Sequence, residues 1–292
     1  GGWVGSGENK SPQAAYWVSA TNSQNIDRFV NNLVALVNEF GLDGLDIDWE
    51  YPQGDSGWQQ YMNLCRKLRE KLPGKRLSSA LPGSTPNGYY SNVVKNGIMN
   101  ALDAIHLMAY DMEGSWGNHS ALAPSKKLID DWAQWTAGTE GYDKEKLFLG
   151  VPFYSKKNFA EWKDFGNETR FYQDQYTDEY GVVQTYNSST TLRNKTEYCY
   201  DKGYGGIMIW ELSQDFAPSH KLSLLKVLYN TTDSLGGYTE GKLRIAVNYN
   251  NAGGKLTVGG ATISSGSSIE LESGQSKTVT ITANSGYEIS EV

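Results

Sequence analysis

Three carboxylates alternate along one short segment of the chain, and their spacing is its strongest chemical signal. The run DGLDIDWE at positions 43–50 carries Asp46, Asp48 and Glu50 at every second residue. In a β-strand such residues share one face, about 6 to 7 Å apart, while the apolar residues between them point to the other face. Like charges at this spacing repel one another, so the arrangement does not help folding. The pattern therefore indicates catalysis.

Two structural alternatives fit this segment less well. One is a solvated edge strand, but helical patterns flank the segment on both sides, which favours a buried parallel strand. The other is a metal site. Calcium-binding loops intersperse acids with Gly and Asn, and the three histidines, His106, His119 and His220, are scattered along the chain. We therefore expect neither a metal ion nor a cofactor.

The positions of the acids favour one kind of sugar chemistry. Asp48 disfavours a second ionised carboxyl beside it, so Glu50 can stay protonated near neutral pH and act as a general acid. The usual glycosidase pair lies about 5 to 9.5 Å apart across the sugar, which is awkward for neighbours on one strand. Such neighbours suit a substrate that brings its own nucleophile, an N-acetyl group, with a carboxylate to orient and stabilise it.

The sequence DGLDIDWEYP at 43–52 resembles the D-x-x-D-x-D-x-E signature of glycoside hydrolase family 18, the chitinase family with substrate-assisted retaining catalysis. Four further segments resemble strands of that family, in the family's order: Gly1–Trp3, Met108–Asp111, Gly150–Tyr154 and Gly205–Leu212. The resemblance covers roughly residues 1 to 230. Several segments in the right order are far more specific than any single motif.

The resemblance implies a catalytic role for four residues. Glu50 would protonate the glycosidic oxygen, and Asp48 would turn toward the acetamido N–H and stabilise the oxazolinium ion. Asp46 would hold the proton balance behind Asp48. Tyr110 would donate its hydroxyl to the acetamido carbonyl, which holds that oxygen in line with the anomeric carbon.

The resemblance also implies substrate contacts. Asp111 would contact the bound sugar, and Trp210 would form the floor beneath it, at the face where barrels place their sites. Trp3 and Trp116 are candidate stacking platforms on the leaving-group side. The remaining candidate contacts are Met108 and Tyr154. An aromatic residue in an apolar strand is more often part of the core, and that alternative stays open for Tyr154.

Alternating helices and strands predict the fold. The expected helices are 23–40, 55–72, 89–101, 125–137, 188–202 and 219–229, and the expected strands are 42–49, 76–82, 103–110, 146–154 and 205–211. Such alternation implies an α/β protein with a parallel sheet, and site residues at successive strand ends favour the TIM (β/α)₈ barrel. Only five strands follow the stub at Gly1–Trp3. We therefore expect the first strands to be missing from this chain, with a missing N-terminal segment or a second chain closing the barrel.

Composition changes near the C-terminus. We expect a catalytic barrel over 1–233, a linker over 234–241 and a small, incomplete β module over 242–292, which is rich in Gly, Ser, Thr and Val with period-two runs. The module weakly resembles surface-repeat or carbohydrate-binding modules, and a spacer is an equal alternative.

The composition excludes several classes of function. A net charge of −7 argues against nucleic acid as the main partner, and no run of 18 apolar residues exists to span a membrane. The two cysteines, Cys65 and Cys199, fall inside predicted helices, so a disulfide framework is not expected. The family resemblance implies a secreted or cell-surface protein.

The leading hypothesis is hydrolysis of chitin or chitooligosaccharides, that is, β-1,4-linked N-acetylglucosamine. An endo-β-N-acetylglucosaminidase or a peptidoglycan hydrolase would share the acid strand, but the Trp49–Pro52 ending and the tryptophan-rich mouth favour chitin. A non-catalytic chitin-binding lectin is a different class, and the presence of Glu50 argues against it.

Overall fold

The computed structural model describes residues 12–86, 88–112, 117–236, 242–247, 253–264, 267–272 and 276–288. The chain divides into two compact units, Gly1–Leu228 and Tyr229–Val292. Each unit is described by itself below. The domain limits expected at residues 233 and 242 stay a prediction.

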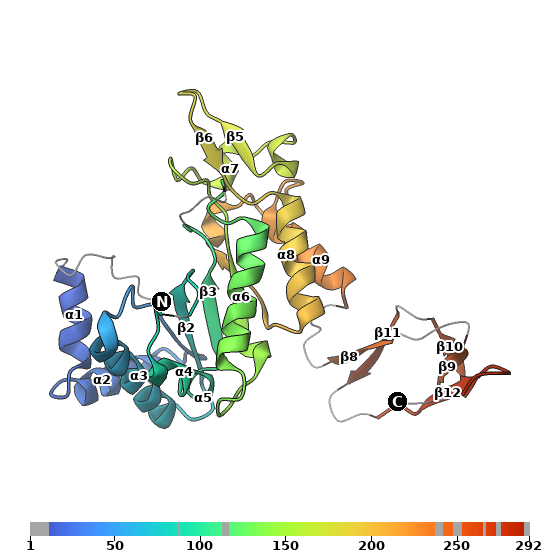
Figure 1. Cartoon of the computed structure of the whole chain (residues 1–292), viewed down its shortest axis with the longest axis horizontal. Coiled ribbons are helices and arrows are strands. Elements are labelled where there is room, and N and C mark those ends of the chain that lie inside the picture. The colour runs from blue at the N-terminus through green and yellow to red at the C-terminus, as the bar shows by residue number, and fades with distance from the viewer. Residues whose placement is uncertain are drawn as a thin grey trace. The chain divides into compact units, whose positions relative to one another are not determined.

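A five-stranded parallel sheet forms the centre of the first unit (Figure 1). Its strands lie in the order β1, β2, β3, β4 and β7, so strands adjacent in the sheet follow one another along the chain. The bounds are β1 Gly44–Ile47, β2 Arg76–Pro82, β3 Ala104–Met108, β4 Leu147–Pro152 and β7 Gly206–Trp210. The five predicted strands and their parallel arrangement are confirmed. Among the described residues, β1 and β7 are the two edges of this sheet.

The helices agree with the predicted segments, with three differences. Their bounds are α1 Pro12–Thr21, α2 Ile26–Glu39, α3 Gly54–Lys71, α4 Asn92–Lys95, α5 Ile98–Ala101, α6 Leu122–Thr136, α8 Ser189–Lys202 and α9 Leu224–Ser234. The sequence analysis missed α1, because its apolar residues form a continuous run without helical period. The helix expected over 89–101 is broken into α4 and α5 at Gly97. That backbone lies against α3, where a Cβ would come within 2.7 Å of the Arg66 guanidinium.

The start of α9 also differs from the prediction, which placed it at 219. Ser223 accepts a hydrogen bond from the Lys226 N–H at 3.1 Å, as a helix-capping residue does. The side chain of Asp215 accepts two more, from the first N–H groups of the helix, Leu224 and Leu225. The polar residues before 223 are therefore a capped loop.

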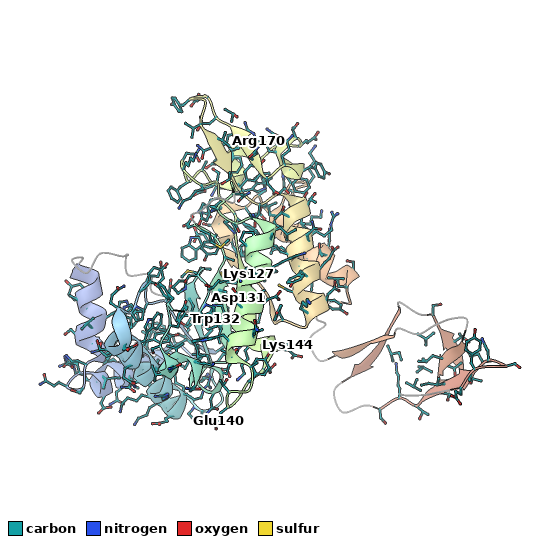
Figure 2. All side chains as sticks on the ribbon, in the orientation of Figure 1. Lys127, Asp131, Trp132, Glu140, Lys144 and Arg170 are labelled. Carbon is teal, nitrogen blue, oxygen red and sulfur yellow. The ribbon has the colours of Figure 1, made fainter. Side chains whose placement is uncertain are left out.

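Helices cover one face of the sheet. α3 contacts β2, α6 and α8 contact β4, and α8 contacts β7. On α6, Lys127 and Asp131 pair at 2.6 Å on the solvent side, while Trp132 is buried against the sheet (Figure 2). Trp132 lies 4.8 Å from Tyr90 between ring centroids, within an aromatic cluster that also holds Trp58. This core leaves the C-terminal ends of the strands free to form a cavity.

A small lobe follows β4. It contains α7 Trp162–Phe165, the 3₁₀ turn Arg170–Tyr172, and an antiparallel pair of strands, β5 Gln175–Thr177 and β6 Val183–Thr185. Two other 3₁₀ turns, Lys144–Lys146 and Leu212–Gln214, precede β4 and follow β7. Trp162 is fully buried at the centre of the lobe, and its indole N–H donates to the carbonyl of Leu222 at 2.8 Å. The lobe thus has its own core.

The second unit contains only antiparallel strands after the end of α9. β8 Lys242–Val247 pairs with β11 Ser267–Glu272, and β9 Gly254–Val258 pairs with both β10 Ala261–Ile263 and β12 Val279–Ala283. The predicted small all-β module is confirmed. Most of the expected linker, residues 237–241, lies outside the described residues.

Two further properties bear on the sequence analysis. Cys65 and Cys199 are both buried and not bonded to one another. No helix in the described part of the chain is long and apolar enough to cross a membrane.

Candidate active site

A cavity of about 1150 Å³ opens at the C-terminal ends of the five parallel strands. Eight of the ten predicted site residues line it: Asp46, Asp48, Glu50, Met108, Tyr110, Asp111, Tyr154 and Trp210. The other two, Trp3 and Trp116, lie outside the described residues. Strand ends that are distant in sequence therefore bring the predicted acids, tyrosines and tryptophan into one site.

Burial of the apolar face of the acid strand points its carboxylates into the cavity. Ile47 and Trp49 are both buried, and the Trp49 ring stacks on Trp17 with a centroid separation of 5.3 Å and an interplanar angle of 5°. Because side chains alternate along an extended chain, fixing these two residues in the core turns Asp48 and Glu50 the other way. The ladder of β1 itself ends at Ile47, earlier than the predicted end of the strand at 49.

Asp48 binds a proton at a much higher pH than an ordinary aspartate does. Burial raises its pKa, and the charges of Glu50 and Asp46 and a hydrogen bond with Glu50 raise it further, to about 7. The hydrogen bond between the two carboxyls places one proton between them, whereas the sequence analysis assigned the proton to Glu50. The raised pKa, however, lies on Asp48, because Asp48 is only 6% exposed and lies between the two other acids.

Asp46 lies behind this pair and is ionised. Burial would raise its pKa, but hydrogen bonds from His106 and Ser78 hold the pKa below the ordinary value of an aspartate. The Ser78 hydroxyl donates to Asp46 Oδ1 at 2.5 Å, and His106 Nδ1 lies 3.3 Å from the same oxygen. The sequence analysis did not identify either partner, because both come from other strands.

Two polar atoms face the cavity with little to bind. Asp48 Oδ1 is buried and has no hydrogen-bond partner among the described residues. The Tyr110 hydroxyl makes one weak contact, with Met208 Sδ at 3.9 Å. Burial, with the charges of Asp48 and Glu50, raises the pKa of Tyr110, so its hydroxyl remains a donor. A buried acceptor and a buried donor are thus available to a ligand that offers an N–H and a carbonyl.

Asp111 is paired with a cation, Lys156, and also contacts His119, whose pKa is lowered by burial. Its Oδ1 lies 3.0 Å from Lys156 Nζ and 3.3 Å from His119 Nδ1. Burial opposes ionisation, but hydrogen bonds from His119, Lys156 and Tyr154 lower the pKa of Asp111 to about 2. The sequence analysis missed Lys156 and His119. Lys156 follows the predicted Tyr154 by two residues, a spacing that places both on one side of a strand end.

The rim of the cavity is aromatic. Trp210, at the end of β7, is 42% exposed and lines the cavity, as predicted. Tyr89 and Phe159 also line it, and the 55% exposure of Phe159 is unusual for so large an apolar ring. Both lie in loops after strands, so hydrophobic periodicity gave no signal for them. The peptide bonds Glu50–Tyr51 and Trp210–Glu211, at the same rim, are cis.

No group of three or more His, Cys, Asp or Glu residues that could hold a metal ion occurs in the described ranges.

Fold and site together define a class: a parallel α/β protein with clustered carboxylates at the C-terminal ends of its strands. The sequence profile of the family described as glycosyl hydrolases family 18 matches residues 1–215. That is more than half of the chain, so the chain belongs to this family, as the resemblance of its motifs predicted.

Known relatives agree with this assignment. Endochitinase 1 of Metarhizium robertsii is 29% identical over 266 residues, which cover 74% of this chain and 60% of that protein. The chain thus spans less than two thirds of that relative's length. Two solved structures share the fold. A chitinase from Bacteroides thetaiotaomicron has a TM-score of 0.62 at 21% identity, covering 80% of this chain and 76% of the other. A plant class V chitinase mutant from Cycas revoluta, in complex with (GlcNAc)3, has a TM-score of 0.59 at 22% identity, covering 77% and 78%.

These matches settle the fold class. The parallel sheet corresponds to that of family 18 TIM-barrel chitinases, and the predicted α/β class with a small C-terminal β module is confirmed.

Proposed function

We propose that this protein hydrolyses β-1,4-linked N-acetylglucosamine polymers by substrate-assisted catalysis, with retention at the anomeric carbon. The observation that carries the proposal is the unpartnered Oδ1 of Asp48. It is buried beside a carboxyl with which Asp48 shares a proton, and it lies in the same cavity as the Tyr110 hydroxyl. An acetamido group supplies both missing partners, an N–H for Asp48 and a carbonyl oxygen for Tyr110.

The first chemical step follows from this arrangement. Glu50 gives the shared proton to the glycosidic oxygen as the bond from that oxygen to the anomeric carbon breaks. The acetamido carbonyl oxygen attacks the same carbon from the opposite face, and a cyclic oxazolinium ion forms. Asp48, now a carboxylate, accepts the acetamido N–H and stabilises the positive charge. Tyr110 holds the carbonyl oxygen in line for the attack.

The second step restores the enzyme. Glu50, now ionised, takes a proton from water, and the resulting hydroxide attacks the anomeric carbon and opens the oxazolinium ring. Two inversions leave the anomeric configuration unchanged. The proton returns to the pair that Asp48 forms with Glu50.

Binding is assigned to the other walls of the cavity. Trp210 offers an exposed ring on which a pyranose can stack, and Asp111 offers a permanent charge for a sugar hydroxyl. The names of the relatives, endochitinase and chitinase, support chitin as the substrate. Chitin is an extracellular polymer, so we propose a secreted or cell-surface location for the mature protein.

The acid assignment is tested by Glu50→Gln, which keeps the shape of the side chain but removes its acid. Hydrolysis of a chitin hexasaccharide should fall by roughly 10²- to 10⁴-fold, the range for a general acid, while binding is largely retained. Glu140→Gln is a matched control, because Glu140 is exposed on a loop far from the strand ends (Figure 2). Undiminished turnover of the Glu50 variant would refute the proposal.

A second experiment tests the nucleophile. A hexasaccharide with a free amine in place of the N-acetyl group on the sugar at the cleaved bond should bind but not be cut there. Cleavage at that bond at an unchanged rate would require a protein nucleophile and would exclude substrate assistance.

A further inference from the structure

His106 is the only histidine near the catalytic carboxylates, and it contacts one of them, Asp46. Asp46, Ser78 and His106 come from three adjacent strands, β1, β2 and β3, and Ser78 is the direct register partner of Asp46. His106 pairs with Ala80, two residues further along β2. The imidazole lies in the wall of the cavity, with its Nδ1 3.3 Å from Asp46 Oδ1.

We propose that His106 is a positioning residue that anchors Asp46 as a carboxylate, so that the catalytic proton stays on Asp48 and Glu50. This inference rests on the proposed function, because it assigns the proton to the pair that protonates the substrate. His106 itself is two residues before the end of β3, and we assign it no contact with the substrate.

The anchor works because one oxygen of Asp46 receives both contacts. Ser78 and His106 both approach Oδ1, which fixes the rotation of the carboxyl group. A carboxylate held by two donors keeps its charge, and that charge raises the proton affinity of the neighbouring Asp48. Without the imidazole, Asp46 could turn and take the proton from Asp48. The proton would then lie on Asp46, and Glu50 could not share it with Asp48 and pass it to the substrate.

The other groups around His106 do not replace it. Phe148 of β4 meets the imidazole edge to face, with ring centroids 5.5 Å apart, and has no titrating atom. Arg76 of β2 and Asp103, just before β3, line a second cavity next to His106. Asp103 is held by Arg69 at 2.5 Å. The groups that can exchange a proton with His106 are therefore Asp46 on β1 and, beyond it, Asp48 and Glu50, which follow β1.

Removing the imidazole should have two effects together. Asp46 becomes a better proton acceptor, so part of the enzyme carries its proton in the wrong place and the plateau of kcat/KM falls. The three carboxyls together also bind the last proton more tightly, because a donor to their negative charge has gone. The alkaline limb of the pH profile therefore moves to higher pH.

The experiment compares His106→Leu with His106→Asn, which keeps an N–H donor near the position of Nδ1. For the leucine variant we expect a fall of several-fold to about tenfold in the plateau and an upward move of the alkaline limb by about half to one pH unit. The asparagine variant should recover most of the plateau of kcat/KM and return the alkaline limb most of the way to its wild-type position. His220→Leu is the control and should leave the profile unchanged, because His220 does not line the cavity. The inference is overturned if the leucine variant loses activity while its alkaline limb stays in place. It is also overturned if the asparagine variant has the same activity and pH profile as the leucine variant. Either result would show that His106 acts by packing.

Carboxyl ¹³C titration tests the same idea in the wild-type protein, without turnover. The signal of Asp48 should move in the last titration step, while Asp46 stays at its ionised position. In His106→Leu the Asp46 signal should move with it. Participation of Asp46 in the wild-type step would overturn the inference even if the leucine variant does not fold. The expected NMR pattern in a protein that cleaves no chitin would instead refute the proposed function and leave the role of His106 standing.

Discussion

Two carboxylates in one cavity have opposite electrostatic surroundings. Asp48 and Asp111 are both aspartates at strand ends, and burial alone would raise the pKa of each. Asp48 has two further acids as neighbours, and its pKa is about 7. Asp111 has Lys156 and His119 within 3.3 Å, and its pKa is about 2. Burial and the charges of two acids raise the pKa of Asp48 together, whereas the hydrogen bonds and the charge of its neighbours outweigh burial at Asp111.

The difference divides the cavity into a reactive side and a binding side. A proton that titrates near neutral pH is useful in catalysis, because it can be given and taken back within one turnover. A carboxylate that stays ionised cannot take part in that exchange, but it accepts a hydrogen bond at any ordinary pH. We therefore assign the acids after β1 to bond cleavage, and Asp111 to holding a sugar.

The largest expected effect comes from the reactive side. Asp48→Asn keeps the size of the side chain but removes the charge that would stabilise the oxazolinium ion. We expect kcat to fall on the order of 10²- to 10³-fold, the cost of losing one preorganised electrostatic contact, with KM little changed. Steady-state kinetics on a chitin hexasaccharide measure the changes in kcat and KM separately. If KM rose and kcat stayed unchanged, Asp48 would be a binding residue, and its contrast with Asp111 would be lost.

A smaller effect is expected from the binding side, in the variant Lys156→Met. It removes one cation from Asp111, whose pKa should rise from about 2 toward the ordinary value of an aspartate. KM should rise by up to about tenfold, with kcat nearly unchanged. The rise should be steeper below pH 5, where Asp111 begins to bind a proton in the variant.

The same substitution has a modest effect on stability. The pKa of Asp111 is lowered on folding, so its contribution is present above the unfolded value of about 3.9 and is lost as the pH falls toward 2. Asp111 and Lys156 are 43% and 28% exposed, so solvent screens the pair and we expect a loss of no more than about 1 kcal/mol. Lys127→Met, which breaks an exposed pair on α6, is the matched control and should leave KM unchanged.

The reactive side was predictable from the sequence because its chemistry lies within one strand. Asp46, Asp48 and Glu50 are local neighbours, and period-two alternation alone places them on one face. The partners of Asp111 and Asp46 were not predictable in this way. Lys156 and His119 come from loops after different strands, and Ser78 and His106 from adjacent strands. Which of them meet depends on sheet register, which the alternation within one strand does not determine.

In the fold, too, features with a signal in the local sequence pattern were predicted, and a feature without such a signal was not. The five strands were predicted because each is a short segment between helical patterns. The helix expected over 89–101 was wrong in its middle, where Gly97 separates α4 from α5. The apolar periodicity of the segment gave no signal for this break.

The smallest effect on activity is expected from a third buried charge, which lies outside the cavity. Lys195 on α8 is fully buried and donates to the carbonyl and hydroxyl of Ser120 and to Asn187 Oδ1, at 2.7 to 2.9 Å. Burial lowers its pKa to about 7, although the charge of Asp174 opposes the change. Like Asp48, it is a buried group that titrates near neutral pH, but it faces protein atoms instead of a substrate.

This difference predicts an effect on stability alone. Between pH 7 and the unfolded pKa of about 10.4, the unfolded chain binds the lysine proton more tightly than the folded one, so the free energy of unfolding rises with pH. The slope is at most about 1.4 kcal/mol per pH unit for one group. Urea unfolding of the wild type and of Lys195→Met at pH 7, 8 and 9 should show that their difference in stability changes with pH. A constant difference would mean that Lys195 titrates normally and that burial does not outweigh the charge of Asp174.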